Sequence, residues 1–505
     1  MSISLLLDMV ESSDPDRTAV VSGSVRVTTA ALGAMTRRAA GLLGSSGIDH
    51  VAYVGTGGIM VPLLLFGSAR AGRAFTPLNY RLSADALREL IARLPAPLVV
   101  ADAEYAGAIR DTGKHVIDSE LFLASTRSAG AEAEDAEAAP GDVAVVLFTS
   151  GTTSRPKAVE LTHANLTSYV MGTVDFASAE PGDAALICVP PYHVAGVGAA
   201  LSNLYAGRKM VYLRQFDPRH WIDLVNDEKI TNATVVPTML DRIVTALEAT
   251  PTALPTLRTL AYGGSKAPLP LVRRTLELLP DVGLVNAYGL TETSSTIAVL
   301  TPADHRDAYR SEDPAVAKRL GSVGRAVPGV ELQIRGENGA VAAPGDTGEL
   351  FVRGPQVSGV YTGTGSALDD EGWFPTRDLA ALDEDGYLFL GGRSDDTIIR
   401  GGENIAPAEL EDVLVEHPHV REAAVVGVAD PQWGQIIVAV VVPIPGSTPD
   451  AQALRDYVRA GLRGSRTPDR VVFRDRLPTT PTGKVLRRSL VEELTPTERT
   501  IEEAS

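Results

Sequence analysis

The sequence predicts an α/β protein. We expect a large N-terminal domain of layered α/β subdomains plus a β-rich subdomain, followed by a small hinged α+β C-terminal domain. Three observations lead to this prediction. Short apolar segments alternate with helical patterns up to about residue 300, glycine-punctuated β-like segments fill residues 320–392, and the charged, Gly-rich stretch GGRSDDT at 391–397 precedes a compact final segment. We therefore place the domains at 1–393 and 394–505 and expect the smaller domain to move.

The first 125 residues contain strand-like segments such as Val51–Val54 and Leu98–Ala101, and a helical pattern, SADALRELIARL, for which Ser83 is the N-cap. Residues 126–142 are acidic, alanine-rich and free of aromatic residues, which predicts an exposed connector or a frayed helix. Between 143 and 300, strand-like segments end in proline, glycine or polar residues: AALICVP, KMVYL, ATVVPT, TLAYGG and VGLVNAYG. Functional loops of open α/β sheets lie at such strand ends.

The next segments, VELQIRG, GELFVRG and GYLFLGG, predict β-structure. The final segment adds the strand-like AAVVGV and IIVAVVV and a helix at 450–463. Each apolar segment is short and ends at glycine or charged turns, which is typical of strands rather than of long helices.

Composition restricts the function. The 505 residues carry a net charge of −17, which argues against non-specific nucleic-acid binding, and the single cysteine, Cys188, excludes an internal disulfide and fits a reducing cytoplasm. The N-terminal stretch MSISLLLDMVESSD lacks a basic region, so we do not expect a signal peptide. No window approaches the roughly 18 apolar residues of a membrane-spanning helix. We expect a cytoplasmic protein without stable membrane insertion and without a nucleic-acid partner.

The stretch TSGTTSRPK, residues 149–157, follows the apolar run Val143–Phe148. Hydroxyls, a glycine and a lysine suit a loop that clasps phosphates, although the Gly-Lys pair of the common phosphate loop is missing. The following AVEL predicts a strand and Thr162 the start of a helix, so the expected clasp is strand–loop–strand. A mobile surface loop is the alternative.

Three further stretches also have two interpretations each. In YGLTE, Tyr288 could stack on a nucleotide base and Glu292 could bind Mg²⁺. The alternative is that these residues simply form the capped end of a strand. In WFPTRDLA, Asp378 suits ribose hydroxyls, or it is a turn residue. In PTGKVLRR, Lys484 suits an anionic site, or it is a solvated charge.

Taken together and in order, TSGTTSRPK, PPYHVAG, YGGS, YGLTE, TRD, GRSDD, GGENIAP and PTGK resemble the adenylate-forming superfamily of acyl-CoA synthetases, adenylation domains and luciferases. The resemblance extends from residue 15 to residue 490. It implies that a carboxylate and ATP give an acyl-adenylate and pyrophosphate, and that the acyl group then passes to a thiol. The implied cofactors are ATP, Mg²⁺ and a phosphopantetheine thiol donor, either a holo acyl carrier protein or coenzyme A.

The resemblance also implies roles for individual residues. The β- and γ-phosphates are assigned to Thr149, Ser150, Gly151, Thr152, Thr153 and Lys157. The adenine side is assigned to Gly263, Gly264, Ser265, Asn286, Ala287, Tyr288 and Gly289. Thr291 and Glu292 meet the α-phosphate and Mg²⁺, and Asp378 with Arg393 holds the ribose.

The remaining roles concern the reacting groups. Lys484 bridges the carboxylate and the α-phosphate, so the implied catalytic set is Lys484, Glu292, Thr149 and His193. The acyl group is assigned to His193, Val194, Gly196, Gly264 and Gly289, with a buried, hydrogen-bonded histidine as the alternative for His193. Asp395 matches the hinge, and Gly401 and Gly402 match the tunnel for the thiol arm. Three positions depart from glycines of the family pattern, namely Ser154, Ala158 and Arg377, and Arg377 puts the geometry of the ribose site in question.

The segment HVAGVGAALSNL contains no acidic residue to pair with a substrate ammonium, which disfavours an amino acid. Neither HVAGVGAAL nor VVPTML contains an arginine for a second carboxylate. We therefore expect a fatty acid as the substrate, and an aryl acid remains open. The alternative function is that of a stand-alone aryl- or amino-acid adenylating enzyme. A nucleotide-binding regulator with a decayed site is disfavoured because Lys484, Glu292 and Asp378 are all present.

The thiol donor is suggested by charge. Residues 455–488 contain ten Lys or Arg and three acids, with Arg455, Arg459 and Arg463 spaced along one helical face. This face attracts an anionic pantetheine donor, or it is simply a solvated basic helix. YGGS, GRS and GGENIAP look most like actinobacterial fatty-acid ligases of lipopeptide assembly, so an acyl carrier protein acting in trans is favoured over coenzyme A.

Overall fold

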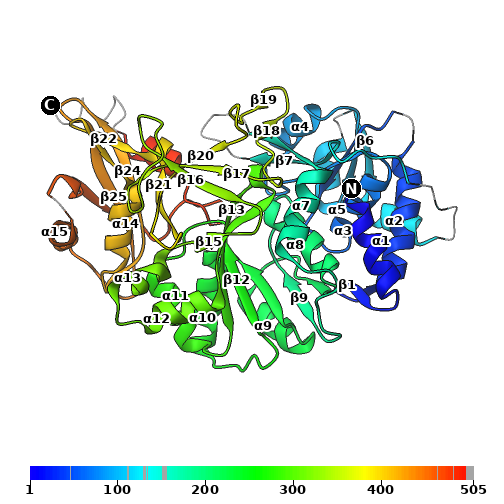
Figure 1. Cartoon of the computed structure of the whole chain (residues 1–505), viewed down its shortest axis with the longest axis horizontal. Helices are drawn as coiled ribbons and strands as arrows, with labels where there is room; N and C mark the ends of the chain where they lie inside the picture. Colours follow the sequence, from blue (N-terminus) through cyan, green and yellow to red (C-terminus); the bar gives the residue numbers. More distant parts are fainter. Residues whose placement is uncertain are drawn as a thin grey trace.

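The structure is a computed structural model that describes residues 1–45, 47–110, 113–128, 132, 135–149, 156–462, 464–480 and 483–495. Within these residues, an eight-stranded sheet and a nine-stranded sheet form most of the large domain, and a four-stranded sheet completes it. Two smaller sheets, of two and three strands, lie beyond residue 396. The α/β architecture and the small C-terminal domain predicted from the sequence are both present (Figure 1).

The eight-stranded sheet is mainly parallel in its N-terminal half. Its order is β19 (Gly365–Ser366), β18 (Val360–Tyr361), β8 (Lys157–Thr162), β7 (Val143–Thr149), β4 (Ala74–Leu78), β3 (His50–Val54), β5 (Pro97–Ala101) and β6 (His115–Asp118). The predicted strand–loop–strand clasp is confirmed to the extent that β7 and β8 pair in antiparallel and flank the loop. The loop residues 150–155 lie outside the described residues.

The nine-stranded sheet combines distant parts of the chain. Its order is β15 (Arg325–Ala326), β14 (Ser295–Leu300), β13 (Gly283–Leu290), β12 (Thr259–Gly263), β11 (Asn232–Val235), β9 (Ala184–Ile187), β10 (Lys209–Tyr212), β1 (Thr18–Ser22) and β2 (Val25–Thr28). The four-stranded antiparallel sheet consists of β16 (Glu331–Arg335), β17 (Gly348–Arg353), β20 (Phe374–Leu382) and β21 (Leu388–Arg393).

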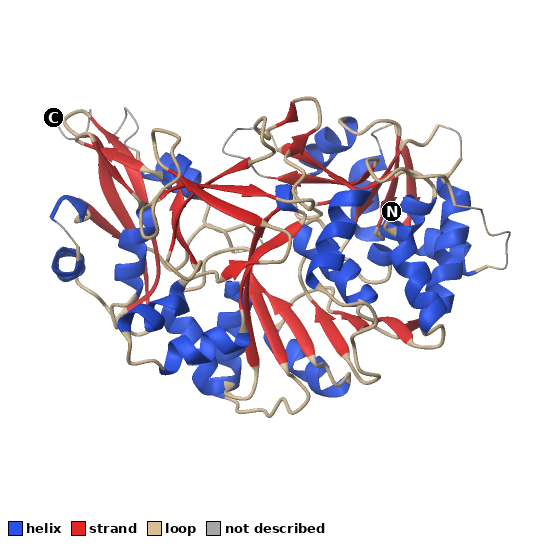
Figure 2. Ribbon diagram, in the orientation of Figure 1, coloured by secondary structure: helices blue, strands red, loops and turns tan. Residues whose placement is uncertain are grey.

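Helices fill the space between the two large sheets and cover their outer faces (Figure 2). The inner layer contains α1 (Ser4–Ser13), α2 (Thr29–Leu43), α3 (Met60–Arg70), α7 (His163–Thr173) and α8 (Val194–Tyr205), which share one apolar core with both sheets. Helix α3 is buried on all sides, in keeping with its apolar residues up to Gly67, and its buried Arg70 is paired with acids. Outside the eight-stranded sheet lie α4 (Ala84–Ala92) and α5 (Ala103–Ile109), and the predicted Ser83 cap of α4 is confirmed by its bond from the Ala86 N–H at 3.3 Å.

The outer face of the nine-stranded sheet packs against α9 (Pro218–Asp227), α10 (Pro237–Ala249) and α11 (Leu269–Leu278). The short elements α12 (Pro302–Arg310), α13 (Pro314–Ala317) and η3 (Lys318–Gly321) follow. Among the helices of the described residues, none is both long and apolar enough to cross a membrane.

The described residues 135–142 of the acidic stretch 126–142 are mostly exposed, as expected of a connector, and helix α6 (Ser119–Arg127) ends near the start of the stretch. Two of its acids, Glu132 and Asp135, are nevertheless paired with arginines of the large domain. Asp135 receives two hydrogen bonds from the buried Arg70, at 2.8 and 2.9 Å, and Glu132 pairs with Arg37 at 2.6 Å. The sequence could not show this because the partners lie 65 and 95 residues away.

The C-terminal domain begins after β21 with η4 (Ser394–Asp396). It has two apolar cores of its own, one on each side of the sheet formed by β24 (Val420–Asp430), β25 (Gly434–Pro443) and β26 (Arg470–Phe473). The other elements are β22 (Ile398–Arg400), β23 (Glu403–Ile405), α14 (Pro407–Val415), α15 (Ala451–Gly461), η5 (Gly464–Arg466) and α16 (Arg487–Leu494). In Figure 1 the domain (orange) lies at one end of the molecule, opposite the N-terminal helices (blue).

Candidate active site

A partly buried carboxylate, Asp378, stands where three strands meet. Asp378 of β20 accepts hydrogen bonds from the Tyr288 hydroxyl of β13 at 2.5 Å and from Arg393 Nη1 of β21 at 3.3 Å. Burial raises the pKa of Asp378 above its ordinary value, whereas Tyr288, Arg393 and the nearby Lys484 oppose the rise. The structure thus brings together four of the residues that the sequence nominated for the ribose, the adenine and catalysis.

A bulge in β20 presents Asp378 to this corner. Glu349 of β17 pairs with Leu379 and Phe351 pairs with Pro375, so residues 376–378 stand opposite Leu350 alone. A bulge of this kind re-aims a side chain and favours a left-handed residue, usually glycine. Arg377 occupies that position with φ of +66°, so the backbone keeps the conformation that suits glycine although the residue is arginine.

Lys484 reaches this corner from the C-terminal domain. Burial and the neighbouring Arg393 lower the pKa of its ammonium, while Asp396 and Asp378 oppose the decrease, so the ammonium lies among these charges. The preceding Gly483 packs on Thr238 at the start of α10, since a Cβ built on Gly483 would be 2.9 Å from the Thr238 methyl. The loop that carries Lys484 is therefore docked on the large domain.

An ion pair also joins the two domains. Lys266, next to the nominated Ser265, donates to Asp412 of α14 at 2.6 Å. Asp395, the nominated hinge residue, lies in η4 with its carboxylate 3.8 Å from Arg393. Both contacts are made in the orientation that presents Lys484 to Asp378.

Gly401 and Gly402 are exposed in this orientation. They form the two-residue turn of the β22–β23 hairpin, with φ of +58° and +85°. A two-residue turn with positive φ at both positions requires residues such as glycine. The Gly401 N–H donates to the Trp433 carbonyl at 2.8 Å, and the Trp433 ring packs against the turn. The turn is thus anchored to the loop that carries Trp433.

The phosphate side is built at the ends of β7 and β8. Thr149 pairs directly with Lys157 across the ladder, and Lys157 Nζ lies 5.2 Å from the centre of the Tyr361 ring. The Tyr361 hydroxyl donates to Glu292 Oε1 at 2.9 Å. The nominated residues Ser150, Gly151, Thr152 and Thr153, and the departure Ser154, lie outside the described residues.

Tyr361 was missed in the sequence analysis. It lies on the two-residue strand β18, which leaves the four-stranded sheet and pairs with β8, placing Tyr361 opposite Val159. So short a strand carries no periodic signal, so only the pairing shows that this tyrosine reaches Glu292. The departure Ala158 needs no glycine, because it is a buried residue of the regular strand β8, paired with Phe148.

The adenine side depends on close backbone approach. A Cβ on Gly263 would lie 2.2 Å from the Ala287 carbonyl oxygen, and one on Gly289 would lie 1.8 Å from the Ser295 carbonyl oxygen. Neither position admits a side chain without moving a strand. Gly264 follows with φ of +83°, and Thr291 opens the short turn η2 (Thr291–Thr293) that carries Glu292. The Asn286 amide donates to the Ser322 carbonyl at 3.3 Å, which fixes the strand edge.

His193 precedes α8 as its N-cap residue. Among the described residues its ring has no hydrogen-bond partner, and burial lowers its pKa, so the neutral ring is favoured. Val194 is buried in the shared core, and Gly196 packs against the Pro190 carbonyl, where a Cβ would lie at 2.6 Å. Val194 and Gly196, both nominated around the acyl group, therefore also have packing roles.

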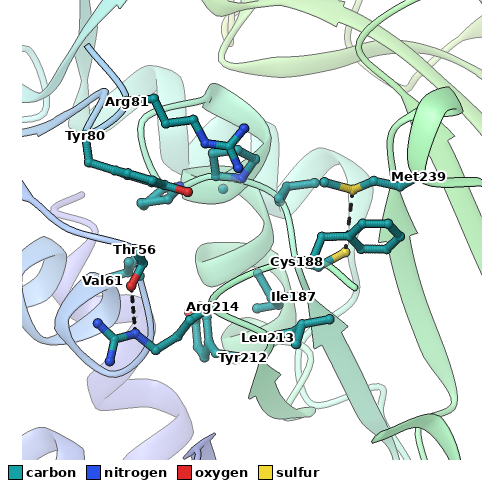
Figure 3. A pocket seen from close by; sticks show the side chains of 16 residues that line it. Thr56, Val61, Tyr80, Arg81, Ile187, Cys188, Tyr212, Leu213, Arg214 and Met239 are labelled. Carbon is teal, nitrogen blue, oxygen red and sulfur yellow. Dashed lines mark hydrogen bonds between the residues drawn. The ribbon is translucent and has the colours of Figure 1, made fainter. Parts of the chain in front are cut away.

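A small cavity of about 20 Å³ is lined by residues that include Pro190 and Pro191, which precede His193, and Thr56, Arg81 and Arg214 (Figure 3). It was not predicted from the sequence. Arg214 is fixed there by Thr56 and Asp102, each at 2.7 Å, whereas the Arg81 guanidinium stacks 5.6 Å from the Tyr80 ring.

The cysteine of this cavity is not a nucleophile. Cys188 Sγ donates to the Thr234 carbonyl at 3.4 Å and lies 4.0 Å from the Met239 sulfur. Burial raises the pKa of its thiol to about 12, so the thiolate is not formed at neutral pH. In the described ranges, no group of three or more His, Cys, Asp or Glu side chains is placed to hold a metal ion.

The basic stretch 455–488 is less free than its charge count predicts. Arg455 donates to the Pro468 carbonyl, Arg459 pairs with Asp456 at 3.0 Å, and Arg487 pairs with Glu411. Arg463 lies outside the described residues. Much of the positive charge is therefore neutralised within the C-terminal domain.

Comparison with known proteins agrees with this geometry. Residues 8–362 match the AMP-binding enzyme family, and residues 409–484 match the AMP-binding enzyme C-terminal domain. Indoleacetate–CoA ligase of Aromatoleum aromaticum is 33% identical, covering 99% of this chain and 100% of that protein. Fatty acid–[acyl-carrier-protein] ligase ScoC of Streptomyces coeruleorubidus is 33% identical, covering 94% of this chain and 93% of that protein.

A solved structure extends the likeness to three dimensions. The o-succinylbenzoate coenzyme A synthetase of Bacillus subtilis, in complex with ATP and magnesium ion, superposes with a TM-score of 0.82 at 28% identity. The match covers 96% of this chain and 98% of that chain, so both domains are included.

Proposed function

The chain belongs to the AMP-binding enzyme family of AMP-forming acid–thiol ligases, and from this premise we propose that it activates a fatty acid with ATP to the acyl-adenylate and then transfers the acyl group to a phosphopantetheine thiol. One observation carries the proposal, namely the docking of Lys484 beside Asp378 and Tyr288. Lys484 brings a positive charge from the C-terminal domain to the proposed nucleotide site, where two anions, the carboxylate and the α-phosphate, must react.

The chain's own residues suit the first step. Asp378 accepts the two ribose hydroxyls, oriented by Tyr288 and Arg393. The Lys484 ammonium stabilises the negative charge that develops when the carboxylate oxygen attacks the α-phosphorus and pyrophosphate leaves. Lys157 and Thr149 face the departing phosphates from β7 and β8.

A magnesium ion fits the donor chemistry at Glu292. Tyr361 occupies one carboxylate oxygen, and a single carboxylate together with substrate phosphates is a usual Mg²⁺ environment. Glu292 would hold the ion, which would neutralise phosphate charge when bound. The ATP and magnesium complex of the Bacillus subtilis relative supports this assignment.

The fatty-acid assignment rests on the absence of charge along α8 and on the relative ScoC. An uncharged pocket rejects ammonium and second carboxylate groups because these would be buried without partners. An aryl or arylacetic acid is the second candidate, because the indoleacetate ligase is equally similar and covers the whole chain.

For the second step we favour an acyl carrier protein in trans over coenzyme A. The relative ScoC, named as a fatty acid–[acyl-carrier-protein] ligase, supports this choice. We further propose that rotation about Asp395 brings the exposed β22–β23 turn, formed by Gly401 and Gly402, to the large domain.

Pyrophosphate release tests the first step. The purified enzyme is given ATP, Mg²⁺ and a panel of fatty, aryl, arylacetic and amino acids, and we expect release with fatty acids. Reactions that also contain coenzyme A and holo carrier protein are then weighed by mass spectrometry, and we expect acylated carrier protein. Pyrophosphate release only with amino acids, or release without any acid, would contradict the proposal. Formation of acyl-CoA without acylated carrier protein would contradict the proposed acceptor.

A further inference from the structure

Tyr361 ends a segment that holds the turn on which Glu292 lies. The Glu292 carbonyl accepts a hydrogen bond from the Ser358 N–H at 2.8 Å. The side-chain amide of the buried Gln356 donates to the Thr293 carbonyl at 3.0 Å. The chain between Gln356 and Tyr361 therefore contacts the backbone of this turn before it reaches the Glu292 side chain.

The residues that follow Glu292 are held in uncommon backbone conformations. Ser294 and Ser295 have φ of +57° and +120°, although neither is glycine. The buried Ser294 hydroxyl donates to the Gln356 carbonyl at 2.8 Å. Such conformations persist where the surrounding structure imposes them, often at functional sites. The backbone at Glu292 is thus fixed by its neighbours, and Tyr361 acts on the carboxylate.

Tyr361 contacts the two charged side chains assigned to Mg²⁺ and to the outer phosphates. Its hydroxyl donates to Glu292 Oε1 at 2.9 Å, and the centre of its ring lies 5.2 Å from Lys157 Nζ. Among the described residues, Glu292 Oε2 has no hydrogen-bond partner. The phenol therefore holds one oxygen of the carboxylate and leaves the other for a cation, while the ring face attracts the ammonium.

The register of β18 against β8 explains how one tyrosine reaches both groups. Tyr361 pairs with Val159, so its side chain lies on the face of the sheet that Val159 shares with Lys157. Tyr361 and Lys157 are diagonal neighbours, a separation that aromatic and long side chains span. The Thr362 N–H continues the pairing by donating to the Ala158 carbonyl at 2.9 Å. A shift of one residue would turn Tyr361 to the other face.

From these contacts we propose that Tyr361 is a positioning residue for the magnesium and phosphate site, which keeps Glu292 Oε2 available to Mg²⁺ and holds the Lys157 ammonium beside the outer phosphates of ATP. This rests on the proposed function, which assigns Glu292 and Lys157 to those groups. Hydrogen-bond partners of a ligating carboxylate orient it, and their loss weakens metal binding by about 10- to 100-fold. The tyrosine therefore increases the affinity for ATP through the ion.

Tyr361→Phe removes the hydroxyl and keeps the ring beside Lys157. The affinity for ATP is measured by calorimetry on the full chain, once with Mg²⁺ and once with EDTA. We expect the affinity with Mg²⁺ to fall about 10-fold, the lower end of the range, because the contact is only partly buried. The affinity in EDTA should change by less than about twofold, since the ring is retained.

Two further variants separate the two contacts. Tyr361→Leu also removes the ring, so the affinity in EDTA should fall about 2- to 5-fold as Lys157 loses the aromatic face. In a Glu292→Gln background, Tyr361→Phe should change the affinity with Mg²⁺ by less than about twofold, because the tyrosine acts through that carboxylate. Tyr309→Phe is the matched control, since its hydroxyl donates to Glu277 at 3.0 Å between α12 and α11, and it should change neither affinity.

Several results would overturn the inference. An unchanged affinity with Mg²⁺ in Tyr361→Phe, or an equal loss with Mg²⁺ and with EDTA, would show that the hydroxyl does not act through the ion. A full loss in the Glu292→Gln background would show that it does not act through Glu292. An unchanged affinity of Tyr361→Leu in EDTA would remove the role at Lys157. None of these results affects the proposed function, which fails if the wild-type enzyme releases no pyrophosphate with any acid.

Discussion

Replacing Lys266 with methionine removes the ion pair to Asp412 that joins the two domains, and it tests whether this contact favours the orientation that presents Lys484. The side chains are 42% and 54% exposed, and the atoms are 2.6 Å apart. Exposed pairs of this kind contribute about 0.2–1 kcal/mol. At about 1.4 kcal/mol per tenfold, this corresponds to an approximately 1.4- to 5-fold change in the ratio of docked to released domain.

The two half-reactions should respond differently. Adenylate formation, measured by pyrophosphate exchange at subsaturating ATP, should fall by no more than about fivefold in Lys266→Met. Thioester formation from supplied acyl-adenylate should be unchanged or faster, because in the proposed second step the C-terminal domain takes a different orientation. Salt should reduce the difference between wild type and variant, since an exposed pair is screened.

A matched control lies within the C-terminal domain. Arg488 and Glu492 form an exposed pair at 2.9 Å on α16 that does not cross to the large domain, so Arg488→Met should change neither half-reaction. An equal loss in both half-reactions of Lys266→Met would refute the reasoning. A loss above about 50-fold would also refute it, because an exposed pair cannot supply so much and Lys266 would then have to act on the nucleotide itself.

Three further predictions concern the same site. Lys484→Ala should lower adenylate formation by about 10²- to 10³-fold and leave thioester formation from supplied acyl-adenylate largely intact; loss of both would contradict the separation of the two faces. Burial lowers the pKa of Lys484 from 10.5 and raises that of Asp378 from 3.8, and activity needs the ammonium and the carboxylate. The pH profile of kcat/KM for pyrophosphate exchange should therefore have the midpoint of its alkaline limb below pH 10.5 and the midpoint of its acid limb above pH 3.8. An alkaline midpoint at 10.5 or higher would show that the pKa of Lys484 is not lowered in the free enzyme. Gly263→Ala should abolish stabilisation by ATP in thermal unfolding, because its Cβ would lie 2.2 Å from the Ala287 carbonyl oxygen, whereas Gly107→Ala, with open space around its Cβ, should retain it.

Local signals in the sequence predicted much of the fold. The strands around 184–290, the Ser83 cap and the helix after Thr162 were predicted because each depends on residues within one short segment. The corner formed by Tyr288, Asp378 and Arg393 was nominated through motifs, and the structure brings these residues into contact.

Long-range pairing was not predictable in the same way. Strand β18 departs from the β-rich segment to join β8, so Tyr361 reaches Glu292 only through an antiparallel pairing about 200 residues apart in sequence. The anchoring of Asp135 by Arg70 and the cavity behind Pro190 likewise depend on residues that the sequence keeps apart. The left-handed backbone conformation of Arg377 could not be predicted, because arginine has no preference for a positive φ.

The partnership of β1 with β10 has a consequence for synthesis on the ribosome. Val20 pairs with Met210, so the N-terminal hairpin β1–β2 must wait for 190 further residues before its neighbour in the sheet is made. At roughly 5–20 residues per second this delay is about 10–40 s. An apolar hairpin cannot be buried during that time by its own segment, so the nascent chain exposes an unpaired strand edge until the middle of the large domain emerges.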